Sequence, residues 1–321
     1  MRRFLYKIIF LVLVTITQTS NAQLMPQLSQ YMLNDYIINP AIGGTYDYWQ
    51  IKSAYHHQWA GFADAPKTYL LGAYGPHKTQ PMGYGGYIFN DVSGPISYMG
   101  VYGSYAYNIR ISGDLRLSMG LALGAIQNSI DLSIIPKDEH GEIDPVVNEN
   151  GNKVSKFMPD GTLGFYLYTS LYYFGFSIDH LFFNNTSVLK NYQEEFNLSD
   201  ARIKPSFNLM GEYKININRN FDLYPTTMIK MAPSYDFVMD LDVRTIYQKM
   251  VWGGLGFRYS MRNVESVIIF VGYNYNDMVN IGYSYDVGIS KLSSESYGSH
   301  EIMIGVKFND IRKSRSRRKI R

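Results

Sequence analysis

The sequence of 321 residues contains no cysteine. This absence excludes disulfide scaffolds, zinc sites with cysteine ligands, iron–sulfur clusters and a cysteine nucleophile. After residue 22 the chain also lacks any apolar run close to the roughly 20 residues that a membrane-spanning helix requires, so a helical membrane protein is excluded. It has neither a phosphate-binding glycine loop with its lysine nor a dinucleotide fingerprint, and we expect no cofactor.

Charge is scarce and unevenly placed, since Asp, Glu, Lys and Arg make up only 18% of the residues. Residues 1–22 carry three basic side chains and 311–321 carry seven, whereas the body between them has 20 basic and 27 acidic residues. A nucleic-acid-binding domain would spread its basic residues over one folded face, so we expect no nucleic-acid partner.

Residues 1–22 are predicted to be a secretory signal peptide. A basic start is followed by the apolar run IIFLVLVTI at 8–16 and by small residues ending at Ala22, which predicts cleavage before Gln23. No cysteine follows the apolar run, so the protein is not a lipoprotein.

The clearest pattern in the body is strict alternation of apolar and polar residues. Residues 115–125 (LRLSMGLALGA) and 237–244 (FVMDLDVR) both have period two, which is typical of a strand with one apolar face. The opposite face of these two segments carries the charged residues Arg116, Asp240, Asp242 and Arg244.

Similar segments recur along the chain, and no amphipathic helix lies between them. The fold is therefore predicted to be all-β, with residues 49–308 forming one domain. The predicted strands are 49–57, 68–74, 82–90, 97–109, 114–127, 162–169, 172–181, 204–215, 221–232, 236–246, 251–260, 266–275, 279–287 and 300–308.

Alternation alone fits either a soluble sandwich or a barrel in lipid, and three features favour a transmembrane antiparallel β-barrel of about 14 strands. Tyr and Phe cluster near strand ends, as in the aromatic girdles of such barrels. Glycines within strands ease the bending of a closing sheet. The longer connections all follow odd-numbered strands, as they would if they shared one end of a barrel; these are 58–67, 91–96, 128–161, 182–203 and 288–299.

Closure has an energetic reason, because in lipid only a closed sheet leaves no backbone group unpaired. An arginine facing lipid at the midplane would cost about 2–4 kcal/mol, so Arg116, Asp240, Asp242 and Arg244 are predicted to face the lumen.

Several motifs resemble those of the PorP/SprF family of the type IX secretion system, in the family's order. They are SQYMLN at 29–34, INPAIGG at 38–44, QWAGFADAPKT at 58–68, IFNDVSGPI at 88–96, IGYSYD at 281–286 and GSHEI at 298–302. The resemblance implies a non-enzymatic outer-membrane barrel in protein secretion. It also implies two kinds of partner: a large secreted adhesin-like protein, and secretion machinery that includes a periplasmic lipoprotein ring.

The connection at 58–66 is one candidate site for binding a partner. Its large apolar side chains are anchors of the kind that dominate interface energies, but the same loop could instead fold onto the barrel rim or into the lumen. The candidate residues here are Gln58, Trp59, Gly61, Phe62, Asp64, Ala65 and Pro66.

The segment 23–48 precedes the first strand and is rich in turn signals, including Asn39 and Pro40. A barrel of about 14 strands lies between the filled and the channel-forming sizes, so something is expected to plug it. This segment is one candidate, the connection 128–161 is another, and a flexible periplasmic lead is the alternative for 23–48.

Other features indicate no chemistry. The acidic residues of 131–160 lack the spacing of a calcium loop, the six histidines form no metal-binding motif, and neighbouring Ser299, His300 and Glu301 cannot by themselves form a triad. We therefore expect neither metal nor catalysis. Residues 309–321 are predicted to be a basic periplasmic tail, either solvated or docked on an acidic partner.

The sequence thus predicts an outer-membrane component of the type IX secretion system, with both termini in the periplasm. Such a protein would bind or anchor adhesin-like cargo for surface display and gliding. A passive diffusion channel for small solutes is the main alternative, and a barrel hydrolase is a second one.

Overall fold

The computed structural model describes residues 27–134, 153–182, 203–232, 235–260, 264–289 and 296–309. The predicted signal peptide and most of the basic tail lie outside these ranges. Within them, strands dominate and the only helices are four single 3₁₀ turns. Among these residues, no helix is long and apolar enough to cross a membrane.

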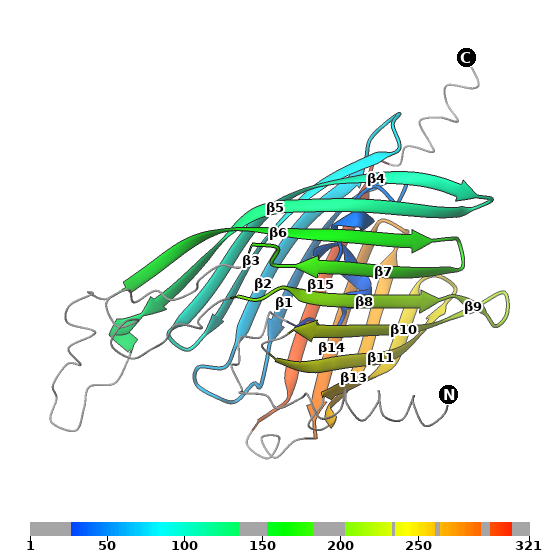
Figure 1. Cartoon of the computed structure of the whole chain (residues 1–321). Coiled ribbons are helices and arrows are strands. Elements are labelled where there is room, and N and C mark those ends of the chain that lie inside the picture. Colours follow the sequence, from blue (N-terminus) through cyan, green and yellow to red (C-terminus); the bar gives the residue numbers. More distant parts are fainter. Residues whose placement is uncertain are drawn as a thin grey trace, which may run out of the picture.

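The strands form one antiparallel sheet in which each pairs with its neighbours in sequence, except that β8 and β9 both pair with β10 and not with each other (Figure 1). Their bounds are β1 Trp49–His57, β2 Lys67–Pro76, β3 Met82–Ser93, β4 Ile96–Ser112, β5 Leu115–Asp131, β6 Lys153–Tyr168, β7 Tyr172–Asp179, β8 Ser206–Tyr213, β9 Ile215–Asn216, β10 Phe221–Ala232, β11 Tyr235–Tyr247, β12 Val251–Ser260, β13 Val264–Tyr275, β14 Val279–Gly288 and β15 Ser299–Phe308.

The sheet closes on itself, because β15 pairs with β1 from Trp49 opposite Phe308 to His57 opposite His300. The two residues of β9 continue β8 along the same edge of β10, so β8 and β9 form a single strand interrupted at Lys214. The protein is therefore a closed antiparallel barrel of 14 strands, and the predicted fold class is confirmed.

Two predicted connections are wrong in their bounds. The connection predicted at 91–96 is only a two-residue turn at 94–95, and the one predicted at 128–161 is shortened because β5 reaches Asp131 and β6 begins at Lys153. At the start of β6 the outward positions are polar, as at the exposed Lys153 and Ser155, so the apolar alternation begins only after the strand does.

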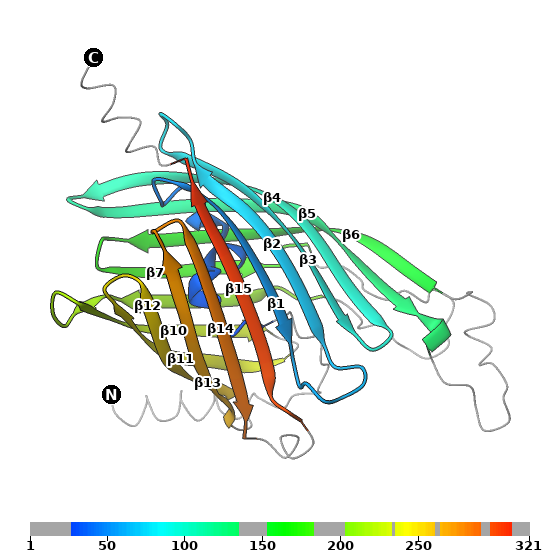
Figure 2. The ribbon, with the colours of Figure 1, turned by 180° about the vertical axis from the view of Figure 1, so that it is seen from behind.

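The two ends of the barrel differ. The short-turn end carries the connections 77–81, 113–114, 169–171, 217–220, 248–250 and 276–278. The opposite end, here called the long-loop end, carries the connection 58–66 and the segments between β5 and β6, β7 and β8, and β14 and β15. Strands β5 and β6 reach further toward the long-loop end than β7, because β6 pairs with β5 from Lys153 onward but with β7 only from Leu163 (Figure 2).

Outward positions form an apolar belt, as a surface in contact with lipid requires. Along β5, Leu121 and Leu123 are exposed, whereas Ala122 between them is fully buried. Aromatic residues at strand ends divide between the faces: Tyr105 and Tyr273 are exposed, but Tyr166 is buried inside. Tyr166 is therefore part of the interior and not of an outer girdle.

The hydrophobic core lies inside the barrel, between the wall and the N-terminal segment (residues 27–48). Three 3₁₀ turns of this segment, η1 Tyr31–Leu33, η2 Asp35–Ile37 and η3 Pro40–Ile42, lie within the ring of strands (Figure 1). Ala41 and Ile42 are fully buried, and Tyr36 is 1% exposed. The segment thus supplies apolar packing that a barrel lined only by its strands would lack.

Candidate functional site: the barrel interior and its N-terminal segment

The N-terminal segment is locally specified by Asn39 and Pro40. The Oδ1 atom of Asn39 accepts a hydrogen bond from the Ala41 amide at 3.0 Å, and Pro40 occupies the first position of η3. Proline suits this position because its fixed φ matches the turn and its missing N–H would have no partner there. The Asn-Pro pair therefore starts the turn that packs against the wall of the barrel.

Asn39 also ties the segment to two strands. Its Nδ2 atom donates to the carbonyl oxygen of Phe165 on β6 at 2.9 Å and to that of Phe176 on β7 at 3.3 Å. Ser177 Oγ, next on β7, donates to the carbonyl oxygen of Ile38 at 2.7 Å. Because Asn39 is fully buried, these bonds satisfy polar groups that water cannot reach.

Close backbone approach fixes the position of η3. A Cβ atom on Gly120 of β5 would come within 2.3 Å of the Ala41 amide nitrogen and 2.5 Å of the Pro40 carbonyl carbon. On β6, a Cβ atom on Gly164 would come within 2.1 Å of Asn39 Oδ1. Glycines in these strands therefore leave room for the segment to lie directly on the wall.

An ion pair holds the middle of the segment. Lys52 of β1 lies 3.5 Å from Asp35, and both side chains are buried. The Lys52 ammonium also donates to the carbonyl oxygen of Leu33. Next to this pair, the rings of Tyr36 and Tyr74 stack at 4.2 Å, and the Tyr36 hydroxyl lies 2.5 Å from Ser104 Oγ.

The beginning of the segment is held by carboxylates in the long-loop half of the lumen. Glu301 of β15 accepts hydrogen bonds from two successive amides, that of Ser29 at 2.7 Å and that of Gln30 at 3.0 Å. The Ser29 hydroxyl donates to Asp286 of β14 at 2.6 Å. Glu301 is 1% exposed, so it is a buried hydrogen-bond acceptor for the backbone of the segment.

Arg258 of β12 links these carboxylates. Its Nε atom donates to Asp240 at 2.8 Å and its Nη1 atom to Asp286 at 3.2 Å. Gln27 Nε2 donates to Asp240 at 3.1 Å, which brings the first described residue into the same network. Buried charges are costly unless they are paired in this way.

Of the four charged residues expected in the lumen, three are deeply buried: Asp240, Asp242 and Arg244 are 1%, 2% and 7% exposed. Arg244 lies 3.3 Å from Glu212 of β8. Arg116 lies near the short-turn end of β5 and is exposed, on the same face as the buried Ser118.

Sequence reasoning missed several polar residues of the lumen, of which Lys52, Arg258, Asp286 and Glu301 contact the segment directly. All of them except His180, which follows β7, occupy inward positions of strands that are largely apolar on their outward face, the same signal that pointed to Arg244. The missed residues are Lys52, Asp160, His180, Glu212, Arg258, Asp286 and Glu301.

The connection 58–66 folds back onto its neighbours at the rim. The Gln58 amide donates to the carbonyl oxygen of Pro66 at 2.9 Å, and the Ala60 amide to that of Gly298 at 2.7 Å. Trp59 and Phe62 nevertheless keep 40% and 39% of their surface exposed. Gly61 is also exposed, and the Asp64 carbonyl oxygen accepts from the Gly94 amide, whereas Ala65 is buried.

In the parts of the chain that the structure describes, no three His, Asp or Glu side chains gather as a metal site. Most of the predicted acidic loop within 131–160 lies outside the described residues. His56 is buried and His57 half-buried, in keeping with their alternation along β1.

Buried hydrogen bonds and ion pairs thus hold the N-terminal segment inside the lumen of the barrel. A family model described as "Type IX secretion system membrane protein PorP/SprF" matches residues 20–306. The chain belongs to the PorP/SprF family. The resemblance seen in the motifs is confirmed, and this PorP/SprF protein is a membrane component of that secretion system.

Solved structures align with this chain at low sequence identity. The toluene transporter TbuX of Ralstonia pickettii aligns with a TM-score of 0.51 at 11% identity, over 85% of this chain and 92% of that chain. The CymD monoaromatic hydrocarbon channel aligns with a TM-score of 0.49 at 12% identity, over 88% and 92% of the two chains. A search of curated proteins found no significant match. The likeness to TbuX shows that this PorP/SprF protein is an outer-membrane type of barrel.

Proposed function

We propose that this protein binds or anchors an adhesin-like exported protein at the cell surface and meets the type IX secretion machinery at its periplasmic mouth. In this arrangement the long-loop end faces outward and the short-turn end faces the periplasm, where a lipoprotein ring would dock. The mechanism is binding and anchorage, without bond chemistry. Family membership supports the link to secretion.

The observation that carries the proposal is the filled lumen. Segment 27–48 crosses the interior, with Ser29 bound in the long-loop half and Pro40 packed against β5 near the short-turn end. A diffusion channel needs an open aqueous lumen, whereas an anchor needs a rigid body with exposed rims. The buried contacts of the segment therefore favour anchorage over solute passage.

The direction of the segment bears on the predicted periplasmic termini. Strand β15 ends at the short-turn end, so the proposed orientation leaves the C-terminal tail on the periplasmic side. Gln27, however, lies beside Asp240 in the long-loop half of the lumen, although β1 begins at the short-turn end. The chain therefore runs the length of the lumen before its first strand.

Docking of cargo is proposed to use the exposed rim around Trp59 and Phe62. Both side chains sit on a loop whose backbone is tied to neighbouring loops, so they are presented without a large ordering cost. Aromatic anchors of this kind commonly dominate binding energy.

The test compares surface proteins of a deletion strain with those of strains that express variants. We expect deletion to remove one large surface protein, and Trp59→Ala with Phe62→Ala to reduce its display. Phe157→Ala, which removes a more exposed aromatic ring from β6, is the matched control and should leave display intact. An unchanged surface proteome together with lost solute uptake would overturn the proposal in favour of a diffusion channel.

A further inference from the structure

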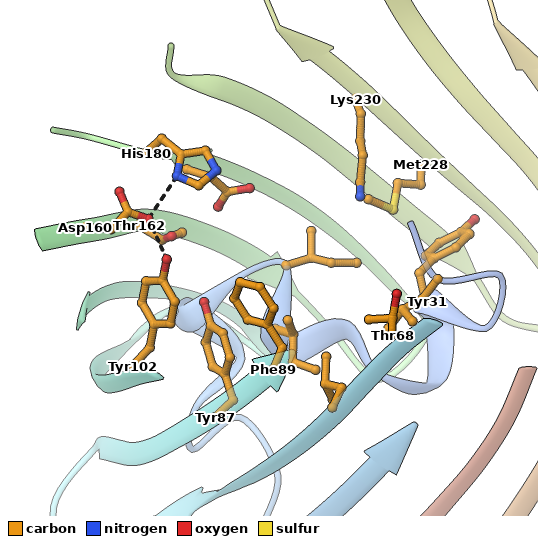
Figure 3. A pocket seen from close by; sticks show the side chains of 15 residues that line it. Tyr31, Thr68, Tyr87, Phe89, Tyr102, Asp160, Thr162, His180, Met228 and Lys230 are labelled. Atoms are coloured by element: carbon orange, nitrogen blue, oxygen red, sulfur yellow. Dashed lines mark hydrogen bonds and ion pairs between the residues drawn. The ribbon is translucent and has the colours of Figure 1, made fainter. Parts of the chain in front are cut away.

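A cavity lies in the long-loop half of the lumen, between the N-terminal segment and the walls formed by β2–β4, β6, β7 and β10 (Figure 3). One side of it is apolar and comes from the segment, where Leu28, Tyr31 and Ile38 face it. None of the contacts that anchor the segment at Glu301 or Asn39 uses this space. The cavity is therefore separate from the features that support the proposed anchorage.

Three aromatic rings form the opposite wall. Tyr87 and Tyr102 stack with their centroids 4.7 Å apart and their planes within 14°, and Phe89 lies 6.4 Å from Tyr102 at 18°. All three side chains are at least nine-tenths buried. This stack of rings lines the cavity with apolar aromatic surface, which favours an apolar ring over a strongly hydrated ligand.

One end of the cavity is polar, and it contains a hydrogen-bond acceptor without a donor. Asp160 Oδ2 accepts from the Tyr102 hydroxyl at 2.5 Å and contacts His180 Nδ1 at 2.9 Å (Figure 3). Asp160 Oδ1 has no hydrogen-bond partner among the residues that the structure describes, although Asp160 is only 1% exposed. An unsatisfied buried acceptor is unfavourable, and a ligand that donates to it removes that cost.

The charges around the cavity do not call for a charged ligand. The Asp160 carboxylate lies 2.9 Å from the His180 ring, and Lys230 on β10 lines the same cavity as Asp160 and Asp179. Both signs of charge are thus already present, and a neutral molecule adds no further charge to this buried site.

We propose that this cavity is a binding site for a small phenolic compound, whose ring lies against Tyr87 and Phe89 and whose hydroxyl donates to Asp160 Oδ1. The apolar wall accounts for the ring and the unsatisfied carboxylate oxygen accounts for the hydroxyl. A bound phenol touches Tyr31 and Ile38, so it also packs against the N-terminal segment. The same ring occurs as the side chain of tyrosine, and a free phenol and a tyrosine of a polypeptide are the two sources of this chemistry.

The experiment uses the full chain in detergent micelles and follows ligands by ¹⁹F NMR. We expect 4-fluorophenol to bind saturably. 4-Fluoroanisole keeps the ring but has no O–H, and it should bind about tenfold more weakly, since a hydrogen bond to a charged group is lost. Equal titration by the two compounds, or the absence of saturable binding, would overturn the proposal.

Variants locate the site. Met228→Trp fills the cavity and should abolish saturable binding, whereas Asp160→Asn should weaken 4-fluorophenol about tenfold and leave 4-fluoroanisole unchanged. Asp222→Asn near the short-turn end is the matched control and should bind like the parent. If Asp160→Asn fails to fold, the comparison of phenol with anisole on the parent protein still decides the matter.

A second arm distinguishes the sources. Displacement of 4-fluorophenol by N-acetyl-tyrosinamide would assign the site to a tyrosine side chain of a polypeptide, and its failure to compete would assign it to a free phenol. Both results keep the phenolic site. Because the readout is ligand binding and not surface display, the site and the proposed anchorage can fail independently.

Discussion

At the residue scale, the charged side chains of the lumen are buried in pairs and networks, which offset the free-energy cost of removing them from water. Lys52 and Asp35 are paired, and Arg258 joins Asp240 to Asp286. Each of these groups would be strongly destabilising alone, because desolvation of a single ion costs several kcal/mol. The network therefore specifies where the N-terminal segment lies more than it adds to net stability.

Replacing one member of a buried pair should reveal this dependence. Lys52→Met leaves Asp35 buried without its partner and should lower the free energy of unfolding by about 3–5 kcal/mol. The double variant Lys52→Met with Asp35→Leu should recover most of the loss. Denaturant unfolding in detergent measures both, and equal stability of parent and single variant would contradict the account.

Glycine at the contact between wall and segment gives a second prediction. Gly120→Val places atoms where Pro40 and Ala41 lie and should cost about 1–3 kcal/mol by overpacking. Gly103→Val on β4 is the matched control, because a Cβ atom there meets nothing within 4 Å, and its effect should stay within about 0.5 kcal/mol. The same unfolding assay compares the two. Similar effects at both positions would show that the contact is not specific.

The role of Glu301 as a hydrogen-bond acceptor for the segment can be tested by hydrogen exchange. Glu301→Ala removes the acceptor of two amides, those of Ser29 and Gln30, and each bond to a charged acceptor contributes about 1.5–3 kcal/mol. Exchange at these two amides should accelerate more than about tenfold, while the strand amides keep their protection. Asp277→Ala in an exposed turn serves as the control and should leave both amides slow.

At the scale of elements, the segment 27–48 decides what the lumen can do. Its three short turns have little stability of their own, since single 3₁₀ turns make few internal hydrogen bonds. Their conformation follows from burial against β4, β5 and β6 and from side-chain bonds to the wall. The segment is thus an element that folds only inside the barrel.

Removing most of the segment should open the lumen. A variant lacking residues 27–42 is expected to conduct ions in planar bilayers, whereas the parent should show little conductance, because the space is filled by buried side chains. An open-pore conductance already present in the parent and unchanged by the deletion would contradict the filled lumen and revive the diffusion channel.

At the scale of the whole molecule, the closed ring and its apolar belt require a lipid or detergent environment. Exposed residues such as Leu255, Val271 and Ile304 would otherwise face water across a wide surface. We expect the purified protein to need detergent for solubility and to migrate differently on gels before and after boiling, as folded and unfolded barrels do. A protein freely soluble in detergent-free buffer would contradict the barrel in lipid.

Period-two alternation determined most of this fold, because every strand of a barrel must turn one face to lipid and the other to the interior. It placed the 14 strands and set Asp242 and Arg244 apart from their apolar neighbours. It failed where strands leave the apolar belt, as at Lys153, since polar residues then face outward and the alternation is lost. It also left open whether Asn39 and Pro40 belong to a flexible lead or lie in the lumen.

Only the tertiary structure decided the contents of the lumen. The partners of the segment, such as Glu301 with Ser29 and Gly120 with Pro40, come from strands far away in the sequence. The strand pattern fixes which way each side chain points but not which distant residue it meets. Closure of the ring brings the inward faces of all the strands together, and this is what creates both the seat of the segment and the aromatic cavity beside it.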